Sequence, residues 1–161
     1  MNIVLVEPEI PQNTGNIART CSVTGTALHL VRPLGFSVED RHLKRAGLDY
    51  WDGLAVQYYD SIGEVLEKYA GNTFHFASTK AIRRYDEAVY GPDDFLVFGK
   101  ETKGLDETLL RAHYSKCIRL PMQEGKRSLN LSSAVAVILY EALRQNDFKG
   151  LKERGVLGNE S

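Results

Sequence analysis

The sequence has few of the patterns that mark disulfide-rich, metal-binding or membrane proteins. Its only cysteines, Cys21 and Cys117, have no metal-ligand spacing, and we expect both to be free thiols. The four histidines form no HxxxH or HExxH pair, so we expect no metal site. No apolar run is long enough to span a bilayer, and residues 1–9 lack the basic region of a secretory signal. These absences predict a cytoplasmic protein with no membrane partner.

The sequence also lacks an excess of charge of either sign. The formal net charge is −1, whereas a protein that holds nucleic acid by bulk electrostatics alone is usually strongly basic. A nucleic-acid partner would therefore have to be bound by local basic patches. Three clusters have this composition, and each is either a solvated surface or a phosphate-binding patch. They are Arg41, Lys44 and Arg45; Lys80, Arg83 and Arg84; and Lys126 with Arg127.

The 161 residues predict a single α/β domain, residues 1–161, with a polar tail after about residue 147. Short apolar runs alternate with helical patterns, which indicates a mostly parallel sheet with flanking helices. We expect helices from Asn13 or Thr14 to Gly25 and, short and basic, over residues 40–46. The expected strands are 2–6, 26–31, 56–59, 73–77, 95–98 and 116–120.

The last long element is the most apolar one. Its apolar residues have the i, i+3, i+4, i+7, i+8 spacing of a helix over residues 132–145. Further apolar residues lie outside that stripe, so the helix is either buried in the core or meets a second copy of the chain. We favour a homodimer interface. The stripe is Val135, Ile138, Leu139, Ala142 and Leu143, and the additional residues are Ala134, Val137 and Tyr140.

The first segment whose polar residues exceed structural need joins the first strand to its helix. Residues 11–20 (PQNTGNIART) place three amides, a glycine and Arg19 at this junction. Open α/β sheets bind ligands at the carboxyl ends of their strands, so Asn13 and Arg19 are candidate site residues. The alternative is a helix start capped by Asn13 or Thr14, with a solvated Arg19.

Two later segments have the same character. Residues 95–105 run from a buried strand into Gly99-x-Glu101-x-x-Gly104, where glycine lets a backbone approach a ligand, or simply forms a turn. Residues 118–134 lead into the apolar helix through four polar residues, although a helix cap needs only one. Neither segment is a GxGxxG motif or a P-loop, which disfavours dinucleotide-binding enzymes and nucleotide hydrolases. The four polar residues are Ser128, Asn130, Ser132 and Ser133.

In this order, the three segments resemble the signature motifs of the SPOUT superfamily, the trefoil-knotted RNA methyltransferases. Residues 7–19 (EPEIPQNTGNIAR), 45–50 (RAGLDY) and 127–132 (RSLNLS) are similar to the TrmL-type subgroup. That subgroup methylates the ribose 2′-hydroxyl of cytidine or uridine at the tRNA wobble nucleotide. The resemblance, from about residue 3 to 145, implies an α/β fold with a deep C-terminal trefoil knot. General rules of chain topology would not have suggested a knot.

The resemblance also implies S-adenosylmethionine (AdoMet) as the cofactor, with no metal. AdoMet would lie bent in the knot, held by backbone groups of three loops, with adenine in an apolar slot. Such a slot accounts for the lack of a charged fingerprint. The implied cofactor-binding residues are Ala77, Gly99, Leu120, Met122 and Ser128.

The implied chemistry assigns roles to five residues. A ribose oxygen attacks the sulfonium methyl in line, and positive charge beside the developing alkoxide assists it. Because a guanidinium stays charged in proteins, we expect Arg19 to stabilise the oxyanion rather than to act as a base. Asn13 and Glu101 would support it, with Glu101 in a bidentate contact to Arg19. Ser128 and Asn130 would bind cofactor and order their loop. The alternatives are a salt bridge for Arg19, a turn cap for Glu101 and a helix cap for Ser128 or Asn130.

The implied partner is the anticodon loop of tRNA. Candidates for phosphate contacts are Arg41, Lys44, Arg45, Lys126 and Arg127. Candidates for stacking on a base are His42, Tyr50 and Trp51, although burial explains the last two equally well. Two other functions stay open. The chain either methylates a different RNA site, a base nitrogen included, or is an inactive RNA-binding module of the same fold.

Overall fold

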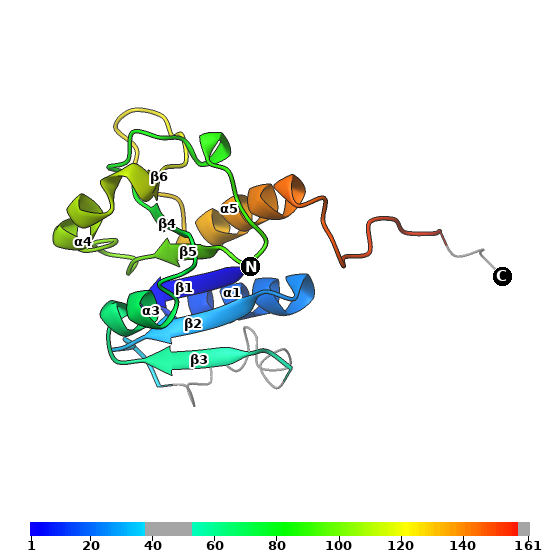
Figure 1. Ribbon diagram of the computed structural model, residues 1–161, viewed down its shortest axis with the longest axis horizontal. Helices are drawn as coiled ribbons and strands as arrows, with labels where there is room; N and C mark the ends of the chain where they lie inside the picture. The colour runs from blue at the N-terminus through cyan, green and yellow to red at the C-terminus, as the bar shows by residue number, and fades with distance from the viewer. Residues whose placement is uncertain (38–52, 158–161) are drawn as a thin grey trace.

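A six-stranded parallel sheet forms the centre of the molecule (Figure 1). The computed structural model describes residues 1–37 and 53–157. The strands are β1 (Asn2–Val6), β2 (Ala27–Val31), β3 (Val56–Tyr59), β4 (Phe74–Ala77), β5 (Phe95–Phe98) and β6 (Cys117–Ile118). Their order in the sheet is β3-β2-β1-β5-β4-β6. The prediction of a mostly parallel α/β sheet is therefore confirmed.

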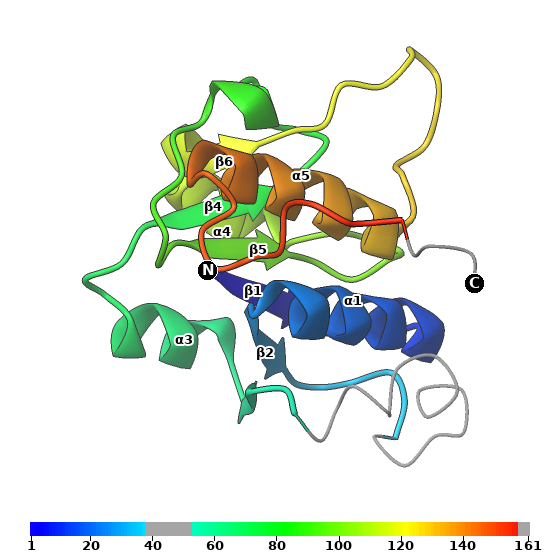
Figure 2. The same cartoon turned by 90° about the vertical axis from the view of Figure 1, so that its right-hand side faces the viewer.

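Helices cover both faces of this sheet (Figure 2). They are α1 (Pro11–Thr24), α3 (Ile62–Lys68), α4 (Glu107–Ala112) and α5 (Leu131–Gln145), with 3-10 turns η1 (Tyr85–Glu87) and η2 (Tyr114–Lys116). Helices α1 and α5 lie on one face, and α3 and α4 lie on the other. Because side chains alternate along a strand, Ile3 and Leu5 pack beneath α1 and α5, whereas Val4 packs on the α3 side. Burial on both faces explains the continuous apolar runs of the strands.

Helix α1 begins earlier than the sequence predicts. The predicted start at Asn13 or Thr14 is wrong, because Pro11 is the first helical residue and Ile10 precedes it without a side-chain cap. Proline fits this position since its missing N–H would have no helical partner there. Asn13 and Thr14 are instead buried within the first turns. The predicted end is confirmed, since Gly25 closes the helix with φ 65°.

Other boundaries differ by one or two residues. The strands predicted from residues 26 and 73 begin at Ala27 and Phe74. The strand predicted over 116–120 is only two residues long, because η2 occupies the preceding segment and Arg119 forms only an isolated bridge. Helix α5 begins at Leu131 rather than Ser132, since Asn130 is its cap. The predicted helical stripe of α5 is confirmed, because all five of its residues are buried.

The ends of the described segments carry less regular structure. After α5, Phe148 and Leu151 pack against the core, and residues 152–157 are exposed and outside any helix or strand. The predicted basic helix over 40–46 lies outside the described residues. Within the described ranges, no helix is long and apolar enough to cross a membrane.

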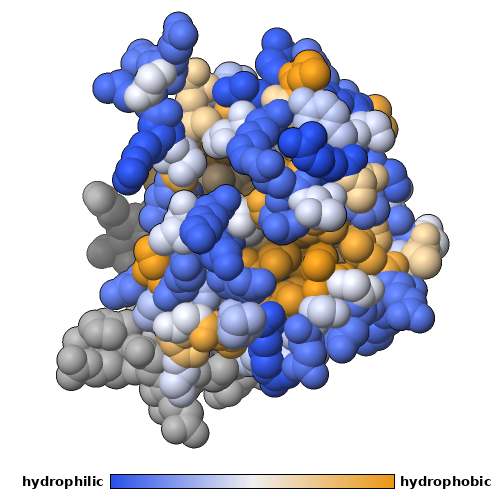
Figure 3. All heavy atoms as spheres, turned by 90° about the vertical axis from the view of Figure 1, so that its left-hand side faces the viewer, coloured by the Kyte–Doolittle hydropathy of each residue, from blue (hydrophilic) through white to orange (hydrophobic). Residues whose placement is uncertain are grey.

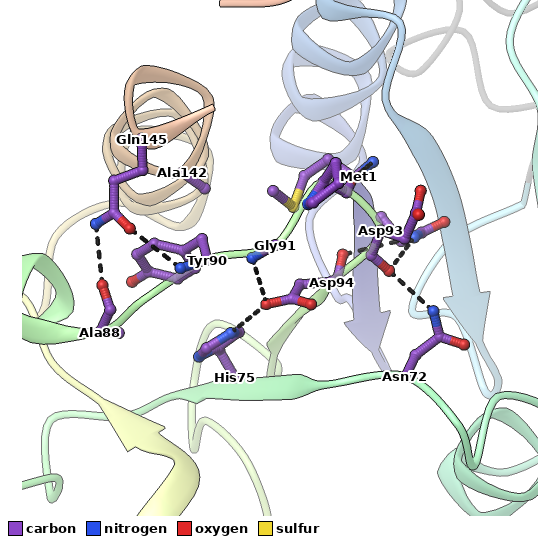
Figure 4. A network of polar contacts seen from close by, with 12 residues as sticks. Met1, Asn72, His75, Ala88, Tyr90, Gly91, Asp93, Asp94, Ala142 and Gln145 are labelled. Carbon is purple, nitrogen blue, oxygen red and sulfur yellow. Dashed lines mark hydrogen bonds and ion pairs between the residues drawn. The ribbon is translucent and has the colours of Figure 1, made fainter. Parts of the chain in front are cut away.

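A network of hydrogen bonds lies at the edge of the sheet where the amino ends of the strands meet (Figure 4). His75 Nε2 lies 2.8 Å from Asp94 Oδ2, and both residues are buried. The same oxygen accepts a hydrogen bond from the Gly91 N–H. Burial lowers the pKa of His75 and so favours its neutral form. Gln145 Oε1 accepts a hydrogen bond from the Tyr90 N–H, which ties the segment before β5 to α5.

Candidate functional site

A cleft of about 1030 Å³ opens at the carboxyl ends of β4, β5 and β6, beside the start of α1. Figure 3 looks onto this side of the molecule, where apolar side chains gather between polar ones. The walls of the cleft are the loops after β4, β5 and β6, together with the starts of α1 and α5. Ligands of parallel α/β sheets bind at this edge, so the cleft is the candidate site.

The cleft collects most of the residues that the sequence predicts for the site. Those lining it are Ala77, Gly99, Leu120, Met122, Ser128, Asn13, Glu101, Asn130, Lys126 and Arg127. Arg19 does not line it and is exposed on α1. The predicted RNA contacts Arg41, Lys44 and Arg45, and the aromatic residues beside them, lie outside the described residues. The structure thus gathers residues of three distant segments, but Arg19, which belongs to the first of them, lies outside the cleft.

Glu101 holds the start of α1. Its Oε2 accepts a hydrogen bond from the Glu9 N–H at 2.8 Å. Its Oε1 accepts hydrogen bonds from the Ile10 N–H at 3.2 Å and from Asn13 Nδ2 at 3.0 Å. A carboxylate is favoured here because helix starts leave N–H groups unpaired and carry partial positive charge. Both Glu101 oxygens are engaged by these groups and not in the predicted bidentate contact with Arg19, so that prediction is wrong.

Asn13 connects Glu101 to the start of α5. While its Nδ2 donates to Glu101, its Oδ1 accepts a hydrogen bond from Asn130 Nδ2 at 2.9 Å. Asn130 Oδ1 in turn accepts hydrogen bonds from the N–H and the hydroxyl of Ser132, and Asn130 thereby caps α5. A single chain of hydrogen bonds therefore joins the three predicted segments. Asn130 is the helix cap, and Ser128 lines the cleft without that role.

Gly99 lines the cleft, but the backbone of its own loop is what requires a glycine. A Cβ atom at Gly99 would lie 2.1 Å from the Gly104 carbonyl carbon and 2.2 Å from the Leu105 nitrogen. Both distances are far shorter than real Cβ contacts. The loop folds back at Gly104, whose φ is 69° and whose N–H donates to the Lys100 carbonyl. The turn that the sequence offered as an alternative is therefore present.

Sequence reasoning missed a second set of contacts between these loops. The Glu9 carboxylate accepts hydrogen bonds from the Thr102 N–H at 3.0 Å and from its hydroxyl at 2.8 Å. Lys100 Nζ donates to Glu7 Oε2. The available signal was two acidic residues, one on each side of a proline, directly after a buried strand. Their position predicts contact with the loop after the neighbouring strand once the strand order is known.

The walls of the cleft suit an adenosyl group. Leu105, Ile118 and Ile138 provide apolar surface. Within the described residues, the backbone amides of Leu120 and Met122 donate no hydrogen bond, so they are available to a ligand. Apolar surface with a few backbone donors is the usual composition of a cofactor pocket. Among the described residues, no group of three or more metal-ligating side chains is placed to hold a metal ion.

The outer surface of the α1/α5 layer is partly apolar. Arg19 and Val23 lie on the exposed face of α1, and Val23 is 57 % exposed. Val137 and Tyr140 lie on the exposed face of α5, 41 % and 47 % exposed. Because α1 and α5 pack side by side over the same sheet face, the exposed faces form one surface, which we call the α1/α5 face (Figure 2). Arg19 therefore lies on the same surface as three exposed apolar residues.

A parallel α/β sheet with a three-loop cleft at its carboxyl edge is the architecture expected of the knotted methyltransferases. The chain belongs to the SpoU rRNA Methylase family, whose sequence model matches residues 1–140. The fold of this family carries the trefoil knot. The prediction of that family and of its fold is confirmed.

Individual relatives are similar over nearly the whole chain. A protein of Listeria innocua named "Putative tRNA (cytidine(34)-2'-O)-methyltransferase" is 53 % identical over 93 % of this chain and 90 % of its own length. A structure described as "Structural insights into the 2-OH methylation of C/U34 on tRNA" is 44 % identical, with a TM-score of 0.86 over 91 % of this chain and 95 % of that one. The SpoU methyltransferase AviRb of Streptomyces viridochromogenes, solved in complex with AdoMet, shares the fold at 24 % identity. Its TM-score is 0.80 over 91 % of this chain and 58 % of that one.

Proposed function

We propose that this chain transfers the methyl group of AdoMet to the ribose 2′-hydroxyl of nucleotide 34, the wobble nucleotide of tRNA. The observation that carries the proposal is the hydrogen-bond chain from Glu101 through Asn13 to Asn130 along the wall of the cleft. It joins the three segments that resemble the signature motifs of the SPOUT superfamily. The relative from L. innocua, 53 % identical, is named for this reaction.

The cleft residues fit the adenosyl group of AdoMet, which supplies a methyl group activated on a sulfonium. Ala77 and Leu120 would contact the adenine, and the Leu120 and Met122 amides would donate hydrogen bonds to it. Ser128 would orient the other end of the cofactor from the rim of the cleft. Since methyl transfer from a sulfonium requires no Lewis acid, we propose that the reaction needs no metal.

Arg19 reaches a cleft, in this proposal, through a homodimer. It lies on the α1/α5 face with exposed Val23, Val137 and Tyr140, outside the cleft of its own chain. If two copies join through this face, Arg19 enters the interface and serves the cleft of the partner. A closed two-fold contact of this kind is the commonest way in which identical chains associate.

Arg19 would stabilise the oxyanion that develops on the ribose, or orient the phosphate beside it, while a phosphate or water accepts the proton. Lys126 and Arg127 line the cleft and are exposed, which supports a role for both in contacting RNA phosphates. Arg41, Lys44 and Arg45 remain candidates for the same role. The cytoplasm, where tRNA is modified, is the proposed location.

Labelled AdoMet and synthetic tRNA test the proposal. The purified chain should bind AdoMet in a calorimetric titration and transfer label to a tRNA that carries a ribose at nucleotide 34. A matched tRNA with a 2′-deoxy nucleotide at that position alone should receive none. Equal labelling of both tRNAs would refute the assigned atom. AdoMet binding without transfer to any tRNA would favour the inactive RNA-binding module.

A further inference from the structure

We infer that Glu9 and Thr102 are positioning residues that hold Glu101 and Asn13 in register at the cleft. The inference rests on the proposed function, because the geometry it maintains is that of the methyl-transfer site. Each of the two loops presents a carboxylate to the backbone of the other. Glu101 accepts from the Glu9 and Ile10 N–H groups, and Glu9 accepts from the Thr102 N–H and hydroxyl.

We call the contacts of Glu101 with the Glu9 and Ile10 N–H groups, and of Glu9 with Thr102, the clasp. The clasp continues the pairing register of the sheet beyond the strand ends. In β1 and β5, Leu5 pairs with Phe98, a separation of 93 positions. The contacts of Glu7 with Lys100 and of Glu9 with Thr102 have the same separation. Side chains thus replace the backbone ladder where the strands end. Because a slip by one residue would break both contacts, the clasp fixes the relative position of the loops.

The Glu9 backbone is also constrained from a third side. A Cβ atom at Gly35 would lie 2.8 Å from the Glu9 Cα, so the segment after β2 packs directly on it. The Gly35 N–H donates a hydrogen bond to the Pro8 carbonyl at 2.9 Å. The backbone that carries the Glu9 side chain is therefore fixed. The hydrogen bonds of Glu9 with Thr102 consequently restrain the loop that contains Glu101, and not the loop that contains Glu9.

The substitutions separate geometry from charge. Glu9→Ala removes both acceptors and leaves the Thr102 N–H and hydroxyl without them. Glu9→Gln keeps the clasp, because its carbonyl oxygen can accept from the Thr102 N–H while its amide donates to the hydroxyl. Displacements of about 1 Å at a reacting centre cost up to about 100-fold in rate. We therefore expect kcat to fall by about 10- to 100-fold in Glu9→Ala and to stay within about threefold of wild type in Glu9→Gln.

The test measures kcat, KM for tRNA and AdoMet affinity for these variants, and compares them with Glu67→Ala, which removes an exposed glutamate on α3. A positioning role predicts loss in kcat with KM for tRNA and AdoMet affinity within about threefold. It also predicts that adding Thr102→Ala to Glu9→Ala changes nothing further, since both act through one contact. Unchanged kcat in Glu9→Ala, or full additivity of the two changes, would overturn the inference.

Amide hydrogen exchange gives a readout that does not depend on activity. The Ile10 and Thr102 amides should exchange faster in Glu9→Ala than in wild type, and at the wild-type rate in Glu9→Gln and Glu67→Ala. If wild type methylates no tRNA but exchange responds in this way, the proposed function fails and the clasp stands. If wild type is active and neither exchange nor kcat responds, the clasp fails alone.

Discussion

Arg19 is the side chain on which the proposed chemistry depends most. Arg19→Ala should still fold and bind AdoMet, because Arg19 is exposed and lines no part of its own cleft. Its methyl-transfer rate should fall by roughly two orders of magnitude or more, the scale seen when one pre-organised electrostatic donor is removed. Melting temperature and single-turnover rate on one preparation measure both quantities.

Arg19→Lys separates charge from shape. An ammonium lacks the planar fork of a guanidinium, so this variant should recover little of the lost rate. Wild-type methylation by a normally folded Arg19→Ala would remove Arg19 from the mechanism and leave Ser128 and Asn130 as the next candidates. If Arg19 serves only a salt bridge, Arg19→Ala should instead lower the melting temperature, and activity should fall only in proportion to the folded fraction.

Gly99 provides a test of loop architecture. Gly99→Ala places a methyl group 2.1 Å from the Gly104 backbone, so the loop must shift. We expect a lower melting temperature and a loss of AdoMet affinity of tenfold or more, because the displaced loop is a wall of the cleft. Gly53→Ala is a matched control, since nothing lies within 4 Å of its Cβ position. Wild-type values in Gly99→Ala would contradict the backbone explanation.

His29 predicts how stability changes with pH. It is buried, and burial, with Lys68 nearby, lowers its pKa from 6.5 to about 4. The unfolded chain therefore takes up the proton first, so stability is complete above about pH 6.5 and is lost as the pH falls toward 4. The expected loss is up to about 3 kcal/mol at 1.36 kcal/mol per pH unit. Burial also lowers the pKa of His75, so this residue contributes to the same loss of stability at low pH.

Urea unfolding of wild type and His29→Gln at several pH values measures this contribution. The difference in free energy of unfolding between the two proteins should be largest at pH 7 to 8 and shrink toward pH 4. It shrinks because only wild type has a proton to gain at this position. A difference that is constant with pH would show that His29 is not held neutral in the folded protein.

Residue types and the family resemblance were enough to nominate most of the residues that line the cleft, but not to predict their partners. Asn13 could be named because amides gather at the end of the first strand, and Glu101 could be named because its segment resembles a family motif. That Glu101 contacts the Glu9 and Ile10 amides instead of Arg19 could not be, since it depends on which loops the strand order makes neighbours. The Thr102 contact with Glu9 was missed for the same reason.

At the scale of elements, the α1/α5 face carries the dimer prediction. Tyr140→Glu places a charge on the exposed face of α5, where the proposed interface would desolvate it without a partner. We expect this variant to be monomeric by light scattering at micromolar concentration and to lose at least tenfold in methyl transfer. Leu157→Glu, at a residue 95 % exposed in the C-terminal segment, is the matched control and should change neither. A fully active wild-type monomer would refute the dimer.

The elements themselves were largely predictable. Helix α5 follows from apolar periodicity. Strand β5 follows from a short apolar run between Pro92 and Gly99, because short length and flanking proline and glycine favour a strand over a helix. The start of α1 was misplaced because Asn13 has the composition of a cap but is used in the cleft. Strand β6 was predicted too long. It lies at the edge of the sheet and pairs only with β4, and only its two residues Cys117 and Ile118 take part in that pairing.

At the scale of the whole molecule, periodicity could give the sheet and its layers but not the path of the chain through them. The strand order β3-β2-β1-β5-β4-β6 brings the ends of β4, β5 and β6 together, and the cleft exists only because of that order. Knots are rare enough that only the family resemblance suggested one. The candidate site therefore depends on the strand order, which local sequence patterns do not determine.

Mass spectrometry of the methylated tRNA identifies both the nucleotide and the atom that receive the methyl group. The purified chain, AdoMet and an unmodified tRNA are incubated with and without a metal chelator, and the product is digested and sequenced by mass. We expect one added methyl group, on the ribose of nucleotide 34, in equal yield under both conditions. A methyl group on a base, or on the ribose of any other nucleotide, would contradict it.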